Sequence, residues 1–148
     1  MKSFFACVLA ALAAQVSATP LPASECGDWM LFALEKNSEQ LTTFAPNDNV
    51  TLTWSTQNSK VEYIREVGLF SAKSNEFLHA QYMSFPGANA TDGQLSFDLS
   101  VPLCLQRDDV YYLGVYASTP GEDSNCFSQT PLFKLSADLE GNYTVCNL

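Results

Sequence analysis

A strictly alternating pentapeptide at positions 50–54 restricts the local structure of this chain to a β-strand. Val50, Leu52 and Trp54 alternate with two threonines, so an extended backbone sends three large apolar side chains to one face and two hydroxyls to the other. The preceding Pro46–Asn49 segment combines a fixed φ with three residues that tolerate turn geometry. We therefore expect a half-buried strand that is entered from a tight turn.

The same rhythm of short apolar strands and polar turns continues along the chain. Leu95, Phe97, Leu99 and Val101 alternate with polar residues without a fault, whereas Arg65 interrupts an alternating pattern and predicts a bulge. With 50–54, the predicted strands are 29–34, 60–72, 77–83, 95–101, 110–117 and 131–135. About seven short strands without a long amphipathic helix predict an all-β, immunoglobulin- or fibronectin-like antiparallel β-sandwich.

The strand predicted at 110–117 has two distinct faces. Tyr111, Leu113, Val115 and Ala117 occupy the phase expected to face the core. Long polar connections are predicted before the strand at 95–101, at residues 85–93, and after the strand at 110–117, at residues 118–125.

The N-terminus has the pattern of a secretory signal peptide. Lys2 precedes an apolar run that is too short to span a membrane, and small residues end at Ala18. We expect a signal peptide at 1–18, an extended leader at 19–25 and a single domain at 26–148. Since no second long apolar run and no hydrophobic tail follow, we expect a soluble, secreted protein without a membrane anchor.

Cysteine usage fits an oxidising compartment. Cys7 lies in the signal peptide, which leaves an even set of four: Cys26, Cys104, Cys126 and Cys146. Three pairings are possible, and we expect Cys26–Cys146 and Cys104–Cys126, so two disulfides in all. A zinc site is the competing use of four cysteines, but no paired C-x-x-C spacing supports it. No metal or other cofactor is expected.

Three asparagines, Asn49, Asn89 and Asn142, begin N-x-Thr sequons and are candidate glycosylation sites. The formal net charge of the chain is -9. Such a chain repels phosphate backbones and anionic headgroups, so neither nucleic acid nor a membrane is an expected partner.

Residues suited to catalysis are sparse. His79 is the single histidine, and it lies in a predicted strand without a nucleophile motif, so we interpret it as a partly exposed strand residue. Glycoside hydrolysis needs only two carboxylates. The candidate pairs are Glu62 with Glu66, Asp108 with Asp109, and Glu122 with Asp123. The last two pairs are also candidate calcium ligands, but no spaced loop motif supports a calcium site. Most of them fall in turns, where acidic residues are ordinary, and we predict no enzymatic activity.

Aromatic side chains give the best candidate binding site. Tyr112 and Tyr116 occupy the phase opposite the core residues of their strand, and Phe70 does the same in its own strand. If these strands are neighbours, the three rings form an exposed aromatic face on which sugar rings can stack. The competing interpretation is that tyrosine simply fits outward strand positions. Tyr111, in the core phase, is a candidate corner tyrosine.

Four segments together resemble a known family. The segments are FAPNDNVTLTW at 44–54, VGLF at 67–70, LSVP at 99–102 and DDVYYLGVY at 108–116. Their order and spacing resemble the fungal cell-wall synthesis KRE/KNH-like domain, which also occurs in Ser/Thr-rich GPI-anchored membrane proteins. The resemblance covers about residues 30–136, and here neither a Ser/Thr-rich stalk nor a GPI signal follows.

The resemblance implies a secreted fungal β-sandwich that is associated with the cell wall or with β-glucan assembly, and it carries no catalytic residues. We therefore expect a non-enzymatic extracellular protein that binds or organises wall polysaccharide. The alternative is a secreted effector or interaction protein that binds a host or neighbouring protein. Retention on a polysaccharide distinguishes the two hypotheses.

Overall fold

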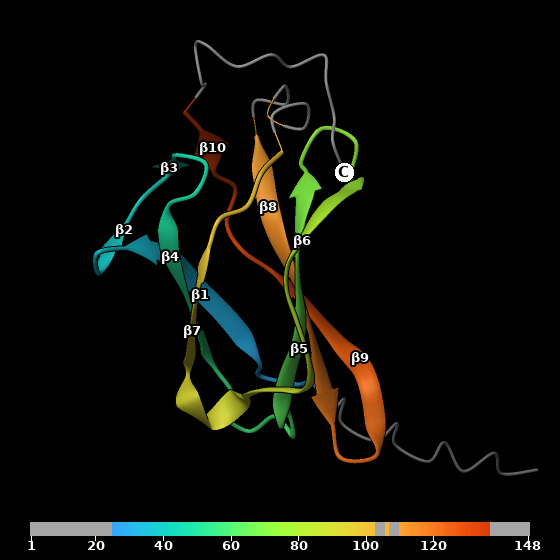
Figure 1. Ribbon diagram of the computed structural model, residues 1–148. Helices are drawn as coiled ribbons and strands as arrows, with labels where there is room; N and C mark the ends of the chain where they lie inside the picture. The colour runs from blue at the N-terminus through green and yellow to red at the C-terminus, as the bar shows by residue number, and fades with distance from the viewer. Residues whose placement is uncertain (1–24, 103–105, 107–109, 137–148) are drawn as a thin grey trace, which may run out of the picture.

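The computed structural model describes residues 25–102, 106 and 110–136, and nearly all regular structure in them is β-strand (Figure 1). The strands are β1 (Met30–Lys36), β2 (Glu39–Gln40), β3 (Thr43–Phe44), β4 (Asn49–Ser55), β5 (Tyr63–Ser71), β6 (Phe77–Asn89), β7 (Gln94–Asp98), β8 (Tyr111–Thr119), β9 (Glu122–Gln129) and β10 (Lys134–Leu135). A single turn of 3-10 helix, η1 (Ala90–Asp92), joins β6 to β7. The all-β prediction is confirmed. In this part of the chain, no helix has the length and apolar character needed to cross a bilayer.

Two four-stranded antiparallel sheets make up the fold (Figure 1). The first sheet has the order β2-β1-β4-β7, and the second has the order β6-β5-β8-β9. The two short strands β3 and β10 pair in parallel. The chain changes sheet between β4 and β5, between β6 and β7, and between β7 and β8, so each sheet is assembled from distant segments.

Strand β4 has the predicted alternation. Val50 and Leu52 are fully buried and Trp54 is nearly so, whereas the residues between them are only half-buried. On the neighbouring strand β7, Phe97 lies opposite Val50 and Leu95 lies opposite Leu52. These cross-strand pairs place the apolar face of the first sheet toward the second sheet.

The second sheet supplies the other half of the core. The predicted inward residues of β8 are all fully buried: Tyr111, Leu113, Val115 and Ala117. They pack in one cluster with Ile64 and Leu69 of β5 and with the inward residues of the first sheet. Burial of a leucine or isoleucine side chain stabilises a fold by about 1.5–3 kcal/mol. Since the inner, apolar face of each sheet is used for this core, the outer face is the one that each sheet exposes to other molecules.

Strand β9 contradicts the loop predicted at 118–125. A turn at Pro120-Gly121 joins β8 directly to β9, and the φ of Gly121 is +79°. Strand β9 lies at the edge of its sheet, and most of its side chains are exposed. Its sequence therefore lacks the apolar alternation by which a half-buried strand is recognised.

Two other boundaries differ from the prediction. Strand β6 runs on to Asn89, through most of the predicted loop 85–93. Strand β7 ends at Asp98, before the predicted end at Val101. Beyond it, the backbone groups of Leu99 bond to the turn before β4: its N–H donates to the Asp48 carbonyl, and its carbonyl accepts from the Asn47 N–H, both at 2.8 Å. The apolar alternation in the sequence continues past the end of β7 because Leu99 and Val101 are also buried.

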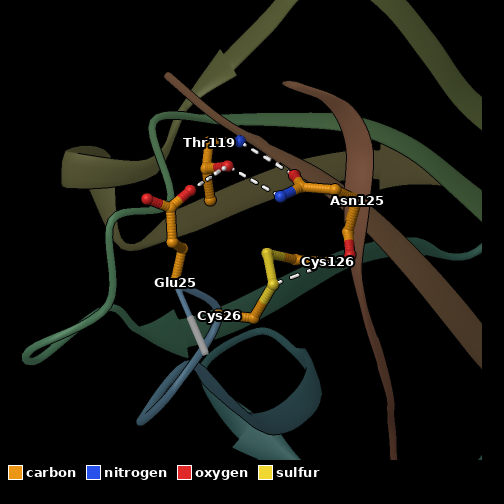
Figure 2. The surroundings of a disulfide bond; sticks show 5 residues. All are labelled: Glu25, Cys26, Thr119, Asn125 and Cys126. Atoms are coloured by element: carbon orange, nitrogen blue, oxygen red, sulfur yellow. Dashed lines mark hydrogen bonds between the residues drawn. A yellow bond between two sulfur atoms is a disulfide. The ribbon is translucent and has the colours of Figure 1, made fainter. Parts of the chain in front are cut away.

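The disulfide pairing predicted from the sequence is wrong. Cys26, just before β1, bonds to Cys126 on β9, across a Cα–Cα distance of 5.5 Å (Figure 2). This bond precludes both Cys26–Cys146 and Cys104–Cys126. It joins the entry to the first sheet to the edge strand of the second, an arrangement that only the strand order determines. Cys104 and Cys146 lie outside the described residues.

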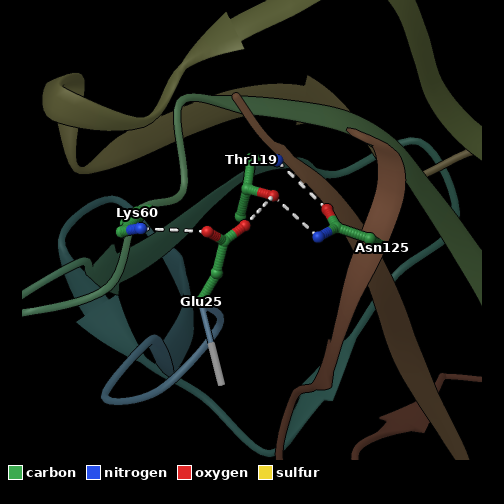
Figure 3. A network of polar contacts seen from close by, with 4 residues as sticks. All are labelled: Glu25, Lys60, Thr119 and Asn125. Atoms are coloured by element: carbon green, nitrogen blue, oxygen red, sulfur yellow. Dashed lines mark hydrogen bonds and ion pairs between the residues drawn. The ribbon is translucent and has the colours of Figure 1, made fainter. Parts of the chain in front are cut away.

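A polar network holds the same junction together (Figures 2 and 3). One carboxylate oxygen of Glu25 pairs with Lys60 Nζ at 2.9 Å, and the other accepts a hydrogen bond from Thr119 Oγ1 at 3.2 Å. Asn125 binds Thr119 twice: its Nδ2 donates to Thr119 Oγ1, and its Oδ1 accepts from the Thr119 N–H. Hydrogen bonding and charge from Lys60 lower the pKa of the exposed Glu25 carboxyl. The network therefore fixes the segment that carries Cys26 against the β8–β9 hairpin.

The turn before β4 is fixed by Asp48, whose side chain is largely buried. Asp48 Oδ1 pairs with Lys36 Nζ at 2.5 Å, and Asp48 Oδ2 accepts from the Ala45 N–H at 2.8 Å. Burial on its own raises the pKa of this carboxyl, but the bonds from Lys36 and Ala45 outweigh burial and lower the pKa below its ordinary value. The charged carboxylate is therefore the form that stabilises the turn.

We predict that Asp48→Asn lowers the free energy of unfolding by about 1.5 kcal/mol at neutral pH, because bonds to a charged acceptor are lost. Because the pKa of Asp48 is lowered in the folded state, its contribution to stability is complete above the ordinary pKa of an aspartate. This contribution is lost as the pH falls through the folded-state pKa. The variant should therefore lose less stability than the parent on acidification, measured by urea unfolding across pH. The exposed Asp92 gives the matched control Asp92→Asn. Equal acid sensitivity of the parent and both variants would contradict the prediction.

Candidate binding surface

The three predicted aromatic residues lie on the outer face of the second sheet. Strands β5 and β8 are neighbours, and Phe70 lies directly opposite Tyr112. Their rings are stacked, with centroids 5.2 Å apart and an interplanar angle of 6°. Tyr116 lies farther along β8, opposite Glu66. The structure therefore brings two of the three rings into contact and places the third on the same face.

Two further phenylalanines extend this set to both edges of the sheet. Phe77 of β6 packs edge-on against Phe70, with centroids 5.5 Å apart. Phe127 of β9 lies opposite Tyr116, and the ring centroids are 5.0 Å apart. We call these five residues, Phe70, Phe77, Tyr112, Tyr116 and Phe127, the aromatic platform. It crosses all four strands of the second sheet.

Two paired glycines lie beneath the aromatic platform. Gly68 of β5 and Gly114 of β8 are opposite each other. A Cβ atom on Gly114 would lie 2.6 Å from the Phe70 ring and 2.8 Å from the Phe127 ring, and a Cβ atom on Gly68 would lie 2.8 Å from the Phe77 ring. The rings of Phe70, Phe77 and Phe127 therefore lie close over the backbone at two positions without side chains. The rings are not coplanar, since Phe77 stands at 78° to Phe70 and Phe127 is tilted by 51° from Tyr116.

Exposure across the aromatic platform differs from the prediction. Tyr112 is 92% buried, with a relative exposure of only 8%, because its neighbours cover it. Phe70 and Tyr116 are half-buried. The rings most open to solvent are Phe77 and Phe127, at 48% and 49%. The three predicted residues are therefore mostly the supporting part of the surface, and the two that were missed are its accessible part.

The outer face of the first sheet has a different chemistry. Thr51 Oγ1 and Ser96 Oγ are hydrogen-bonded at 2.8 Å, and Asn49 Nδ2 donates to Asp98 Oδ1 at 2.9 Å. Strands β4 and β7 thus carry hydroxyl and amide groups on this face. Strand β1 of the same sheet exposes Met30 and Phe32.

Of the candidate catalytic groups, Glu62, Glu66, Glu122 and Asp123 line two neighbouring depressions at one corner of the second sheet. His79 is a half-buried residue of β6, as predicted, and its Nδ1 lies 3.3 Å from Gln81 Nε2. Among the described residues, no group of three or more histidine, cysteine or acidic side chains is arranged to hold a metal ion. Asp108 and Asp109 lie outside the described residues.

The sequon asparagines differ in their contacts. The amide nitrogen of Asn49 is engaged with Asp98, whereas Asn89 uses its amide oxygen to cap η1, accepting from Thr91 N and Thr91 Oγ1. Both asparagines are exposed, so both remain candidates for glycosylation. Asn142 lies outside the described residues.

Comparison with known protein families, with curated proteins and with solved structures returned no match to this chain.

Proposed function

We propose that this chain is a secreted, non-enzymatic protein of the fungal extracellular space that binds or organises cell-wall polysaccharide through the aromatic platform. The observation that carries the proposal is a set of five neighbouring rings that crosses one sheet face, three of which lie close over a glycine pair. The C–H faces of pyranose rings stack on aromatic rings, and rings that extend across an open sheet face suit an extended polymer better than a deep pocket does. The family resemblance adds β-glucan as the expected polymer.

The strand order supports a finer description of the fold. Strands β1, β4 and β7 opposite β6, β5, β8 and β9 follow the order of a fibronectin type III-like sandwich, in which the chain repeatedly changes sheet. We propose that the domain is immunoglobulin-like in this sense. With Cys26 and Cys126 joined, Cys104 and Cys146 are the remaining pair, and we propose that they form the second disulfide.

Co-sedimentation with insoluble β-glucan, chitin and mannan tests the binding function. The parent protein should be retained on at least one polymer in a saturable manner. The double variant Phe77→Ala, Phe127→Ala should bind about thirtyfold more weakly, because it removes the two most accessible rings, each worth about 1 kcal/mol in a stacked contact. Unfolding measurements should show that the variant remains folded.

The first sheet offers a matched control. Met30 and Phe32 are 47% and 49% exposed, close to the values of Phe77 and Phe127, but they lie on β1. The double variant Met30→Ala, Phe32→Ala should be retained like the parent. Absence of retention on every polymer would overturn the proposal and favour the protein-binding alternative. Equal loss in both variants would show that general hydrophobicity, not the aromatic platform, causes retention.

A further inference from the structure

A rigid protrusion stands at one corner of the second sheet, where β6 bulges away from β5. Met83 pairs with Glu66 and Ala88 pairs with Ile64, so the four residues Ser84–Gly87 face only Arg65 on the neighbouring strand. Phe85, within this segment, is 82% exposed, the largest value among the large hydrophobic residues that the structure describes. Met83, which is 70% exposed, lines the same depression as Phe85, so the two side chains form one exposed apolar patch and a candidate contact region.

The side chain of Arg65 contacts the protruding segment Ser84–Gly87 and fixes its position. Its side chain is only 11% exposed, and its guanidinium carbon lies 4.2 Å from the centroid of the Phe85 ring. One terminal nitrogen donates to the Pro86 carbonyl and the other to Asp123 Oδ1, both at 2.5 Å. One face of the Phe85 ring is therefore covered by Arg65, while the rest of the ring stays open to solvent.

Gly87 completes the shape of the protrusion. Its φ is +115°, and a Cβ atom at this position would lie 2.4 Å from the Ile64 carbonyl oxygen. Only glycine fits this conformation and this approach to β5. The ring of Phe85 is thus presented on a segment whose shape is fixed in advance, which lowers the entropy cost of binding.

Two shallow depressions flank Phe85, and acidic side chains line both. The larger, of about 420 Å³, includes Glu66, Met83 and Ser84, and the smaller, of about 350 Å³, includes Glu62, Glu122 and Asp123. Arg65 is the one basic residue in either lining, and it is already bonded to Asp123. The carboxylates of Glu62, Glu66 and Glu122 make no hydrogen bond or ion pair with another described residue. A ligand that stacks on Phe85 therefore lies next to these carboxylates. A positively charged group on the ligand would pair with them.

This corner is continuous with the aromatic platform. Glu66 lies directly opposite Tyr116 on β8 and opposite Met83 on β6. Directly opposite side chains on neighbouring strands have Cβ atoms about 4.5–5.5 Å apart. A single extended polymer can therefore lie on the aromatic platform and reach Phe85 without leaving the sheet face.

We propose that the Phe85 corner is a subsite for a positively charged amino-sugar unit, so that the preferred polymer is deacetylated chitin. The C–H face of the pyranose stacks on Phe85, and its protonated 2-amino group pairs with the carboxylates of Glu66 or Glu122. The inference rests on the proposed function, since it uses the same sheet face, and it replaces neutral β-glucan as the preferred ligand.

Calorimetric titration with matched oligosaccharides at physiological salt tests the proposal. Fully deacetylated chitin oligomers should bind the full-length secreted protein about tenfold more tightly than N-acetylated oligomers of equal length, because only the former carry a charge. The double variant Glu66→Gln, Glu122→Gln should lose this preference and keep its affinity for the acetylated oligomer. The variant Phe85→Ala should weaken binding of the deacetylated oligomer by a similar factor.

Controls separate this subsite from general attraction to an acidic protein. Glu35→Gln, Glu39→Gln removes the same charge from the β1–β2 end of the first sheet and should preserve the preference. An equal loss in this control, or tight binding of oligolysine of the same charge, would overturn the assignment to an amino sugar. Equal affinity for acetylated and deacetylated oligomers would overturn the inference but not the proposed function. Absence of binding to either, together with no retention on any insoluble polymer, would overturn both.

Discussion

Replacement of both Cys26 and Cys126 by alanine is expected to lower the free energy of unfolding by about 4–5 kcal/mol. The two residues are 100 positions apart in the sequence, so the bond closes most of the domain into one loop and removes much of the conformational freedom of the unfolded chain. Alanine is the chosen replacement because it is apolar and the Cys126 side chain is almost completely buried within the core cluster. Denaturant unfolding of the purified protein measures the loss.

The single variants test whether these two cysteines are each other's partners. If they are, Cys26→Ala and Cys126→Ala each break the same bond, and the double variant loses little more stability than either single one. Additive losses would contradict the pairing. Peptide mapping under non-reducing conditions should recover Cys26 linked to Cys126, and it also tests the proposed Cys104–Cys146 bond. A peptide that links Cys104 to Cys126 would contradict both assignments.

The sequence predicted the fold best where a strand has one buried and one outward face. In β4 and β8 the side-chain period of two is read directly from the order of residues, and the buried set came out as expected. The same rule failed for β9, because an edge strand with both faces largely exposed needs no apolar alternation. The cysteine pairing failed for a related reason: Cys126 lies on that unrecognised strand.

The candidate site shows the same division between local and non-local information. Strand phase placed Phe70, Tyr112 and Tyr116 outward, because phase is a local property. Their exposure depends on which rings cover them, and that follows from strand order and from the glycine pair beneath. Phe127 could have been found from the Pro120-Gly121 turn, which is a hairpin signal, followed by a strand antiparallel to β8. Arg65 was recognised as a bulge, but its contact with Phe85 joins residues from two strands.

Replacement of Trp54 by alanine is expected to lower the free energy of unfolding by about 3–5 kcal/mol, the range for large aromatic side chains in a core. Trp54 is only 4% exposed, and its Nε1 donates to the Ala90 carbonyl at 2.8 Å. That bond joins β4 to the η1 turn that returns the chain from the second sheet to the first. Thermal and denaturant unfolding measure the effect.

Trp29 supplies a matched control that separates the hydrogen bond from packing. Trp29 is also nearly buried, at 6%, but no described residue accepts a hydrogen bond from its Nε1. Trp54→Phe leaves the buried Ala90 carbonyl with only the long 3.4 Å bond from the Gly93 N–H, so it should cost about 1 kcal/mol more than Trp29→Phe. Equal losses of unfolding free energy in the two variants would show that the Trp54 hydrogen bond adds no stability beyond that of the buried side-chain volume. Because Trp54 faces the core from the first sheet, folded molecules of both variants should keep parental retention on polysaccharide, which depends on the opposite sheet.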